Sequence, residues 1–221
     1  MSHLLSLVRW TARFLFALTS VAVAIYAFAY LYRSHAAGNP FAAQFAISGW
    51  DVPLHMFLAG LALLLAPLQL SAGVRRRLPA LHRTAGWLYV AAILIGAPSG
   101  LSLAFHAQGG AASGVGFAVL ALLWPLFTLR GVVLAIAGDT AGHRRWMCRS
   151  VALTFAAVTL RVGLGVGAGV LHLPFLSVYI TMAWASWLLN LAMCELILRW
   201  PSWRRARAAG GSRWASRPTG A

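Results

Sequence analysis

Histidines outnumber acidic residues in this sequence, and two of them are placed to hold a haem. The chain has seven histidines and three Asp or Glu residues among 221. His82 and His143 each precede a long apolar stretch, beside Arg83 and Arg144. A b-type haem takes one axial histidine from each of two helices, and cations neutralise its propionates. The spacing therefore favours haem b ligated by His82 and His143, with Arg83 and Arg144 at the propionates.

A second polar set is expected at the opposite ends of the helices. Asp51 and His55 are one helical turn apart at the start of an apolar stretch. A buried arginine costs about 2.5 to 3.5 kcal/mol at the membrane centre, so Arg161 needs a partner or a polar pocket. This predicts an intramembrane site for a proton, an anion or a quinone, formed by Asp51, His55, Thr154 and Arg161. His55 is also the candidate haem ligand at this end.

The expected helix that carries Arg161 has a polar face. At 100° per residue from His143, the side chains of Ser150, Thr154, Arg161 and His172 fall on one narrow stripe. Lipid offers such groups no hydrogen-bond partners. The stripe should therefore face protein or a cavity.

Both polar sets also have a purely structural interpretation. Histidines at a membrane interface can anchor headgroups or bond to exposed backbone groups, and Arg161 can serve an ion pair or a hydrogen bond between helices. Arg130 and Glu195 can extend toward the interface or pair with each other. Under this interpretation the protein binds no cofactor.

Composition places these residues in a membrane. The chain is 61% hydrophobic and 10% charged, with a mean hydropathy of +0.77, which is too apolar for a soluble domain. Six stretches are long enough to cross about 30 Å of hydrocarbon. They cover roughly residues 14–32, 52–72, 84–105, 114–137, 147–171 and 175–198. The expected fold is all-α: a polytopic transmembrane bundle of six helices, forming one domain over residues 1–200.

The distribution of charge predicts the orientation. All eighteen positive residues are arginines, and most lie in clusters between apolar stretches. Such clusters orient a membrane protein and do not follow a phosphate backbone, so no nucleic-acid partner is expected. The positive-inside rule puts both termini in the cytoplasm, across a bacterial inner membrane. Residues 201–221 are expected to be a basic, disordered cytoplasmic tail.

Four glycines follow Arg161 at alternate positions: Gly163, Gly165, Gly167 and Gly169. No strand precedes them, so they do not form a phosphate-binding loop. Within a membrane helix, small residues let another helix approach closely. The sequence has no hydrolase motif, and whether the protein is an enzyme stays open.

Three stretches combine polar residues with long apolar segments. They are His55 to Gln69 (HMFLAGLALLLAPLQ), Leu81 to Tyr89 (LHRTAGWLY) and His143 to Arg161 (HRRWMCRSVALTFAAVTLR). Together they resemble an uncharacterised family of bacterial membrane proteins known as domain of unknown function 2306. The resemblance implies a multi-helix bacterial membrane protein and supplies no reaction. The positions that it makes most worth testing are His55, His82, Arg83, His143, Trp146, Arg149 and Arg161.

The favoured hypothesis is a haem-binding or redox membrane protein of b-type cytochrome character. The alternative is a small-molecule or proton-coupled transport protein that uses the intramembrane polar site. A third possibility is a structural or assembly protein. Apart from the lipid bilayer, the sequence identifies no partner.

Overall fold

Helices form nearly all of the chain that the computed structural model describes, which is residues 2–32 and 49–215. No strand occurs in these ranges. The helices are α1 (Ser2–Tyr32), α3 (Asp51–Leu70), α4 (Ala72–Arg77), α5 (Pro79–Ala104), α6 (Ala111–Ile136), α7 (Thr140–Thr154), α8 (Ala156–Leu164), the π-helical segment η1 (Gly165–Val170) and α9 (Phe175–Ala215). The predicted all-α fold is confirmed.

Six spans in the described residues are long and apolar enough to cross a membrane. They are Ser6–Leu31, Asp51–Leu70, Pro79–Ala104, Ala111–Ile136, Thr140–Val170 and Phe175–Arg199. Each corresponds to one of the six predicted stretches. Many of their large apolar side chains point outward, as on a surface covered by lipid.

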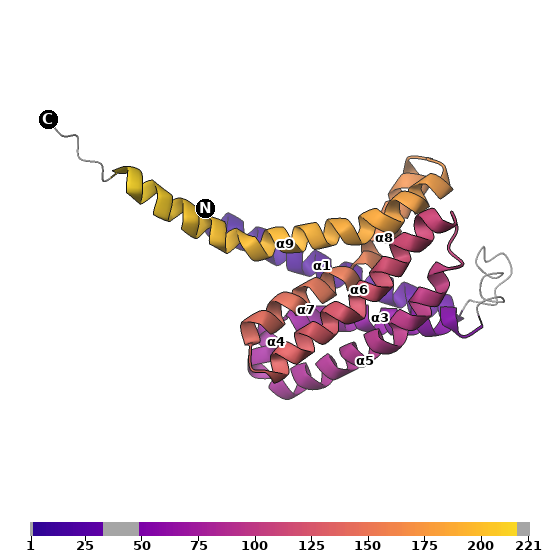
Figure 1. Cartoon of the computed structure of the whole chain (residues 1–221), viewed down its shortest axis with the longest axis horizontal. Helices are drawn as coiled ribbons and strands as arrows, with labels where there is room; N and C mark the ends of the chain where they lie inside the picture. Colours follow the sequence, from indigo (N-terminus) through magenta and orange to yellow (C-terminus); the bar gives the residue numbers. More distant parts are fainter. Residues whose placement is uncertain (1, 33–48, 216–221) are drawn as a thin grey trace.

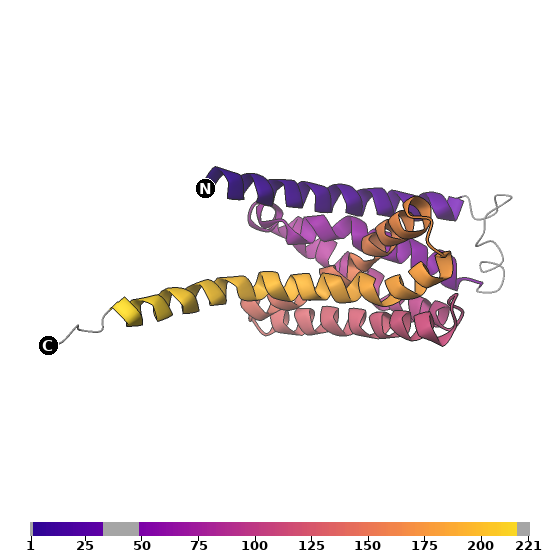
Figure 2. The ribbon, with the colours of Figure 1, turned by 90° about the horizontal axis from the view of Figure 1, so that it is seen from above.

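The spans run side by side, and both ends of the chain lie at the same end of the bundle (Figures 1 and 2). This end carries Arg75–Arg77 in α4, together with Arg83, Arg144 and Arg145. We call it the arginine-rich end. The opposite end, which holds the start of α3 and the turn between α5 and α6, is the far end.

Local signals place the first turns of α5 and α7. Pro79 begins α5, where its missing N–H costs no helical hydrogen bond. Asp139 caps α7, because its Oδ1 accepts the N–H of Gly142 at 2.8 Å. His82 and His143 therefore both lie in a first helical turn at the arginine-rich end.

Five buried polar side chains form a hydrogen-bonded group in the middle of the bundle, which we call the hydroxyl cluster. The Tyr89 hydroxyl of α5 lies 2.9 Å from Ser150 Oγ and 2.7 Å from Thr154 Oγ1, both of α7. From α6, Thr128 Oγ1 lies 2.7 Å from Ser150 Oγ, and Trp124 Nε1 donates to Thr154 Oγ1 at 2.9 Å. The cluster links three helices through groups that lipid would leave unsatisfied.

The fifth span is interrupted. α7 ends at Thr154, Phe155 lies between the two helices, and α8 leaves the direction of α7 (Figure 1). Beyond α8 the backbone winds as η1. The prediction of one continuous polar face is therefore wrong at its last member: His172 follows η1 with a φ of 52° and is exposed.

The four alternating glycines fall into two pairs with different surroundings. A Cβ on Gly167 would lie 2.7 Å from a methyl carbon of Val178, and one on Gly163 would overlap Met182, both residues of α9. Gly165 and Gly169 have nothing within 4 Å of such a Cβ. Close helix approach is thus confirmed for Gly163 and Gly167.

The helix α9 extends beyond its apolar span and projects from the bundle toward the C-terminus (Figure 2). The sequence predicts a disordered tail from residue 201, whereas the chain is helical through Ala215. Residues 216–221 of that predicted tail lie outside the described residues.

Replacing Tyr89 by Phe tests the hydroxyl cluster. The variant loses the central hydroxyl and leaves Ser150 and Thr154 each without one partner, at a cost of about 1–3 kcal/mol. We expect a lower unfolding temperature in detergent. Tyr26→Phe is the control, because the Tyr26 ring is 51% exposed. Equal unfolding temperatures for the two variants would show that the cluster contributes no net stability.

Candidate functional site

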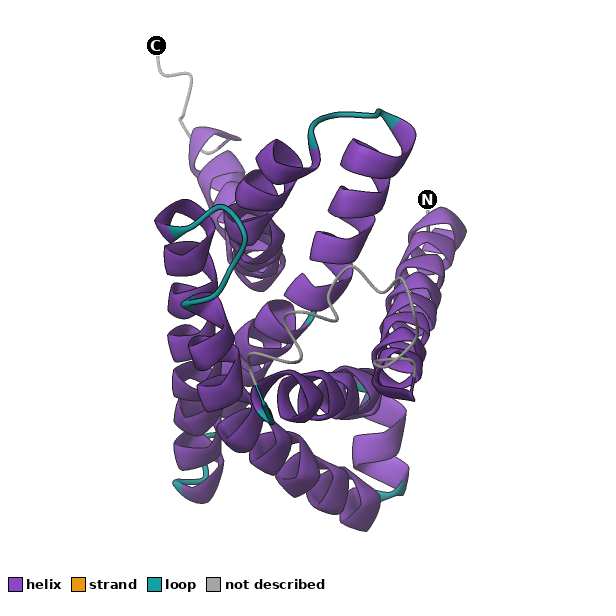
Figure 3. Ribbon diagram, turned by 90° about the vertical axis from the view of Figure 1, so that its right-hand side faces the viewer, coloured by secondary structure: helices purple, strands orange, loops and turns teal. Residues whose placement is uncertain are grey.

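A cavity of about 730 Å³ lies within the bundle, and all six spans contribute to its wall. Its lining comes from the ends of α1 and α5, the starts of α3, α6 and α9, and the junction of α7 with α8, so it occupies the far half of the bundle. Figure 3 views the helices from this end. The volume falls in the range of about 300–1,000 Å³ typical of small-molecule sites.

Most of the wall is apolar, and alanines form much of it. They come from α1, α3, α5, α6 and α8, and include Ala22, Ala59, Ala97, Ala121 and Ala157. An alanine side chain ends at Cβ, so helices that face each other with alanine leave space between them. Alanines from five segments of the chain contribute to this space.

Three of the four residues predicted to form the intramembrane polar site line this cavity. His55 reaches it from α3, Thr154 from α7 and Arg161 from α8. Thr154 also belongs to the hydroxyl cluster, so the cluster extends to the cavity wall. The sequence thus identified polar residues that come together from three helices.

Asp51, the fourth predicted residue, has another partner. Ser102 near the end of α5 donates its hydroxyl to Asp51 Oδ2. This bond ties the start of α3 to the end of α5, and Asp51 does not line the cavity. Asp51 is therefore not a carboxylate partner of Arg161.

Among the described residues, the contacts of the Arg161 guanidinium are with uncharged groups. Its Nη1 donates to the Ala157 carbonyl at 2.9 Å, and its Nη2 lies 3.9 Å from Met56 Sδ. The guanidinium carbon is 5.3 Å from the centre of the Tyr26 ring. These contacts hold the side chain in place without neutralising it.

His55 has a fixed orientation. Its Nδ1 lies 3.1 Å from the Gly96 carbonyl oxygen, which can only accept, so Nδ1 carries the hydrogen and Nε2 keeps its lone pair. The ring packs against Gly100, where a Cβ would lie 2.8 Å from His55 Cε1. Glycine at this position therefore makes the space that the ring occupies.

The two haem-ligand candidates share the arginine-rich end. His82 lies in the first turn of α5 and His143 in the first turn of α7. His143 Nδ1 donates to the Gly131 carbonyl at 2.8 Å, while His82 Nδ1 is buried and has no hydrogen-bond partner among the described residues. A backbone carbonyl bonded to Nδ1 is the usual support for a histidine that binds metal through Nε2. His55, at the far end, cannot share a metal with this pair.

The remaining cations of the predicted haem site are at the surface. Arg83 and Arg144 are exposed at the arginine-rich end, on the same helices as the two histidines. Their length and position suit contact with propionates or with lipid phosphates.

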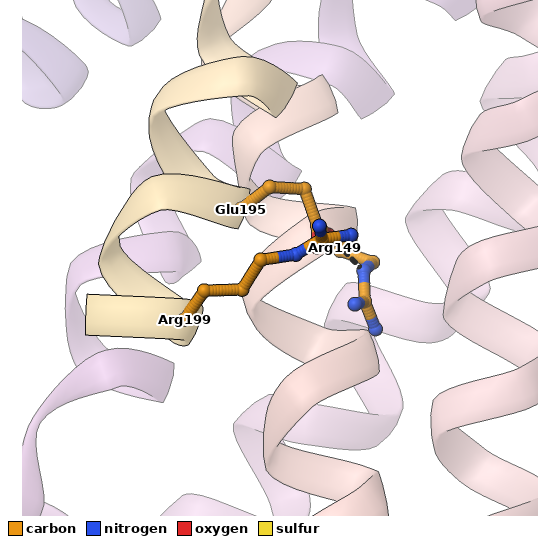
Figure 4. A network of polar contacts seen from close by, with 3 residues as sticks. All are labelled: Arg149, Glu195 and Arg199. Atoms are coloured by element: carbon orange, nitrogen blue, oxygen red, sulfur yellow. Dashed lines mark hydrogen bonds and ion pairs between the residues drawn. The ribbon is translucent and has the colours of Figure 1, made fainter. Parts of the chain in front are cut away.

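Glu195 pairs with arginines other than the predicted Arg130. Arg149 Nε lies 2.5 Å from Glu195 Oε1, and Arg199 Nε lies 3.4 Å from Oε2 (Figure 4). The first pair joins α7 to α9, and both side chains are partly buried. Of the two alternatives for Arg130 and Glu195, mutual pairing is therefore wrong. Glu195 pairs instead with Arg149, which faces α9 from the neighbouring helix.

Several residues of the cavity were not found from the sequence. Ser186 of α9 lines it, is only 1% exposed, and its Oγ has no hydrogen-bond partner within the described part of the chain. Tyr179 and Trp124 add aromatic surface. A single serine in an apolar helix gives no periodic signal, so only the packing of α9 against the other helices reveals it.

Comparison with known families agrees with this architecture. A family described as "Predicted membrane protein (DUF2306)" matches residues 52–198, which span from the second transmembrane helix to the sixth. Neither the search of curated proteins nor that of solved structures gave a match. The matched segment covers well over half of the chain and contains His55, the His82–His143 pair and Arg161. The protein therefore belongs to the DUF2306 family of predicted membrane proteins.

Proposed function

We propose that this membrane protein binds a largely apolar, membrane-soluble molecule inside its six-helix bundle. The observation that carries the proposal is the cavity of about 730 Å³ in the far half, with walls from all six spans. Ligand sites are typically apolar hollows with a few polar groups that fix orientation. Here those groups are His55, Arg161 and Thr154.

Packing energetics support a bound molecule. Side chains around an empty space lose dispersion contacts that neighbouring atoms would otherwise supply. Larger side chains in place of the wall alanines would close the space without disturbing the hydrogen bonds of His55 or Arg161, which go to backbone carbonyls. The binding of a molecule in this space explains why small residues from five segments form the wall.

The same cavity supports the transport alternative. A carrier would take the molecule from one leaflet and release it elsewhere, and this requires a part of the wall that moves. α8 is short, is separated from α7 at Phe155 and continues into η1. We propose α8 as the wall segment whose movement would serve transport.

Haem binding by His82 and His143 is the second candidate function. It is favoured by the position of both histidines in first helical turns at the same end, by the carbonyl that supports His143 and by the Nδ1 of His82, which has no partner among the described residues. Haem held there would supply one-electron redox chemistry. The chain itself would supply two imidazoles from α5 and α7, with Arg83 and Arg144 toward the propionates.

We also propose that the arginine-rich end faces the cytoplasm of a bacterial cell. The support is the concentration of arginine at one end, the end at which both termini lie.

Filling the cavity tests the binding proposal. The Ala157→Phe variant should occupy part of the cavity and displace the bound molecule, whereas Ala91→Phe, at an exposed position of α5 away from the cavity, should not. Native mass spectrometry in mild detergent measures the mass retained by each chain. Wild-type protein that retains no apolar molecule, even after incubation with membrane lipid extract, would contradict the proposal.

Absorption spectra test haem binding. Protein from cells supplied with a haem precursor should show a Soret band that shifts on reduction with dithionite. The band should be lost in His82→Ala and in His143→Ala, and kept in the matched far-end control His106→Ala. A band lost instead in His55→Ala would move the haem to the far end, and no band in any protein would reject the hypothesis.

Reporter fusions test the orientation. A fluorescent protein that matures only in the cytoplasm should fluoresce when fused after residue 221, and alkaline phosphatase, which is active only in the periplasm, should be inactive there. Alkaline phosphatase inserted in the turn between α5 and α6 should be active, because an odd number of spans precedes it. The reverse pattern would invert the assignment.

A further inference from the structure

The charge of Arg161 has no acidic side chain to neutralise it. The whole sequence contains three acidic residues, and all three are described. Asp51 accepts from Ser102, Asp139 caps α7 at the arginine-rich end, and Glu195 pairs with Arg149 and Arg199. Each is occupied at another place in the bundle, so the counter-charge of Arg161 must come from outside the chain's acidic residues.

The position of Arg161 favours a bound anion over a solvated guanidinium. The residue lies within the fifth span, about nine residues before the end of η1, and the cavity that it lines is mostly apolar. A cation in such surroundings gains much more from an anion than it would in water. Planar guanidinium donors also suit the oxygens of a carboxylate or phosphate.

A second group in the same wall lacks a partner. Ser186 Oγ is almost fully buried, lines the cavity and forms no hydrogen bond with the described residues. Most buried hydroxyls find a partner, but Ser186 Oγ exposes almost no surface of its own to the cavity. The guanidinium of Arg161 is therefore the donor on which a ligand assignment can rest.

We propose that the bound molecule is an amphipathic anion, with a carboxylate or phosphate head paired with Arg161 and a hydrocarbon chain along the alanine-lined wall. This inference rests on the proposed binding function and specifies its ligand. The alanines from five segments accommodate the chain by shape, and the Tyr26 ring covers one side of the guanidinium. His55, with its Nε2 lone pair, can accept a hydrogen bond from a singly protonated head.

Three probes that share one hydrocarbon chain test the head group: oleate, monooleyl phosphate and oleyl alcohol. Full-length protein, washed free of lipid in detergent, is titrated with each probe and the dissociation constants are read by native mass spectrometry. We expect at least one anionic probe to bind about tenfold or more tightly than oleyl alcohol, because a charge-assisted pair replaces a neutral contact. The tighter anion identifies the natural head group as carboxylate or phosphate.

Variants assign the preference to Arg161. In Arg161→Gln the preference should fall to about twofold or less while oleyl alcohol binds as before, and Arg161→Lys should retain part of it. Arg130→Gln removes an exposed arginine of α6 that does not line the cavity, and should keep the full preference. The comparison of the three probes on wild-type protein needs no variant. It tests the anionic head group even if Arg161→Gln does not fold.

The outcomes separate this inference from the function on which it rests. Equal affinities of wild-type protein for oleate, monooleyl phosphate and oleyl alcohol would overturn the anionic head and leave the cavity a site for neutral molecules such as quinones. An anion preference that survives in Arg161→Gln would overturn the assignment to this residue. Failure of all three probes to bind would reject the binding function as well.

Discussion

A lipid environment supplies no hydrogen bonds, and this constraint decides where the polar side chains of the bundle lie. The hydroxyl cluster meets it by joining Tyr89, Ser150 and Thr154, with partners from α6, so that three helices satisfy one another. At the arginine-rich end, Glu195 forms ion pairs with Arg149 and Arg199 and so supplies both with a partner. Arg161, which lines the cavity, meets this constraint only in part, because its hydrogen bonds leave its charge without an acidic partner.

Small residues act in two opposite ways in this fold. Gly163 and Gly167 face Met182 and Val178, whose longer side chains fill the room that the glycines leave. Around the cavity, alanines from five segments form part of the wall, beside aromatic side chains such as those of Trp124 and Tyr179. Small residues thus allow α8 and η1 to pack closely against α9, and around the cavity they border open volume.

The spans could be predicted from the sequence, because length and hydropathy suffice to define a transmembrane helix. The polar face of α7 was also predictable, since periodicity along one helix places Ser150 and Thr154 together. Their partners were not, because Tyr89 and Trp124 are on other helices and single-helix periodicity carries no information about neighbours. The interruption at Phe155 has no proline or glycine to announce it. For that reason extrapolation along a straight helix failed at His172.

Partner choice was the least predictable feature of the site. The expected depth of each residue in the membrane suggested Asp51 for Arg161 and Arg130 for Glu195, whereas the structure gives Asp51 to Ser102 and Glu195 to Arg149. The chain has three acidic residues and eighteen arginines. A small rotation of one helix therefore decides which arginine is neutralised. Such rotations depend on packing between helices, which hydropathy does not encode.

The wall of the cavity has a consequence for biosynthesis. Its residues come from α1, which is made first, and from α9, which is made last, as well as from every span between them. A nascent chain that has inserted five spans still lacks Tyr179 and Ser186 and has one side of the space open to lipid. The cavity is therefore completed only when the last helix enters the membrane, so no chain that lacks this helix can form it in full.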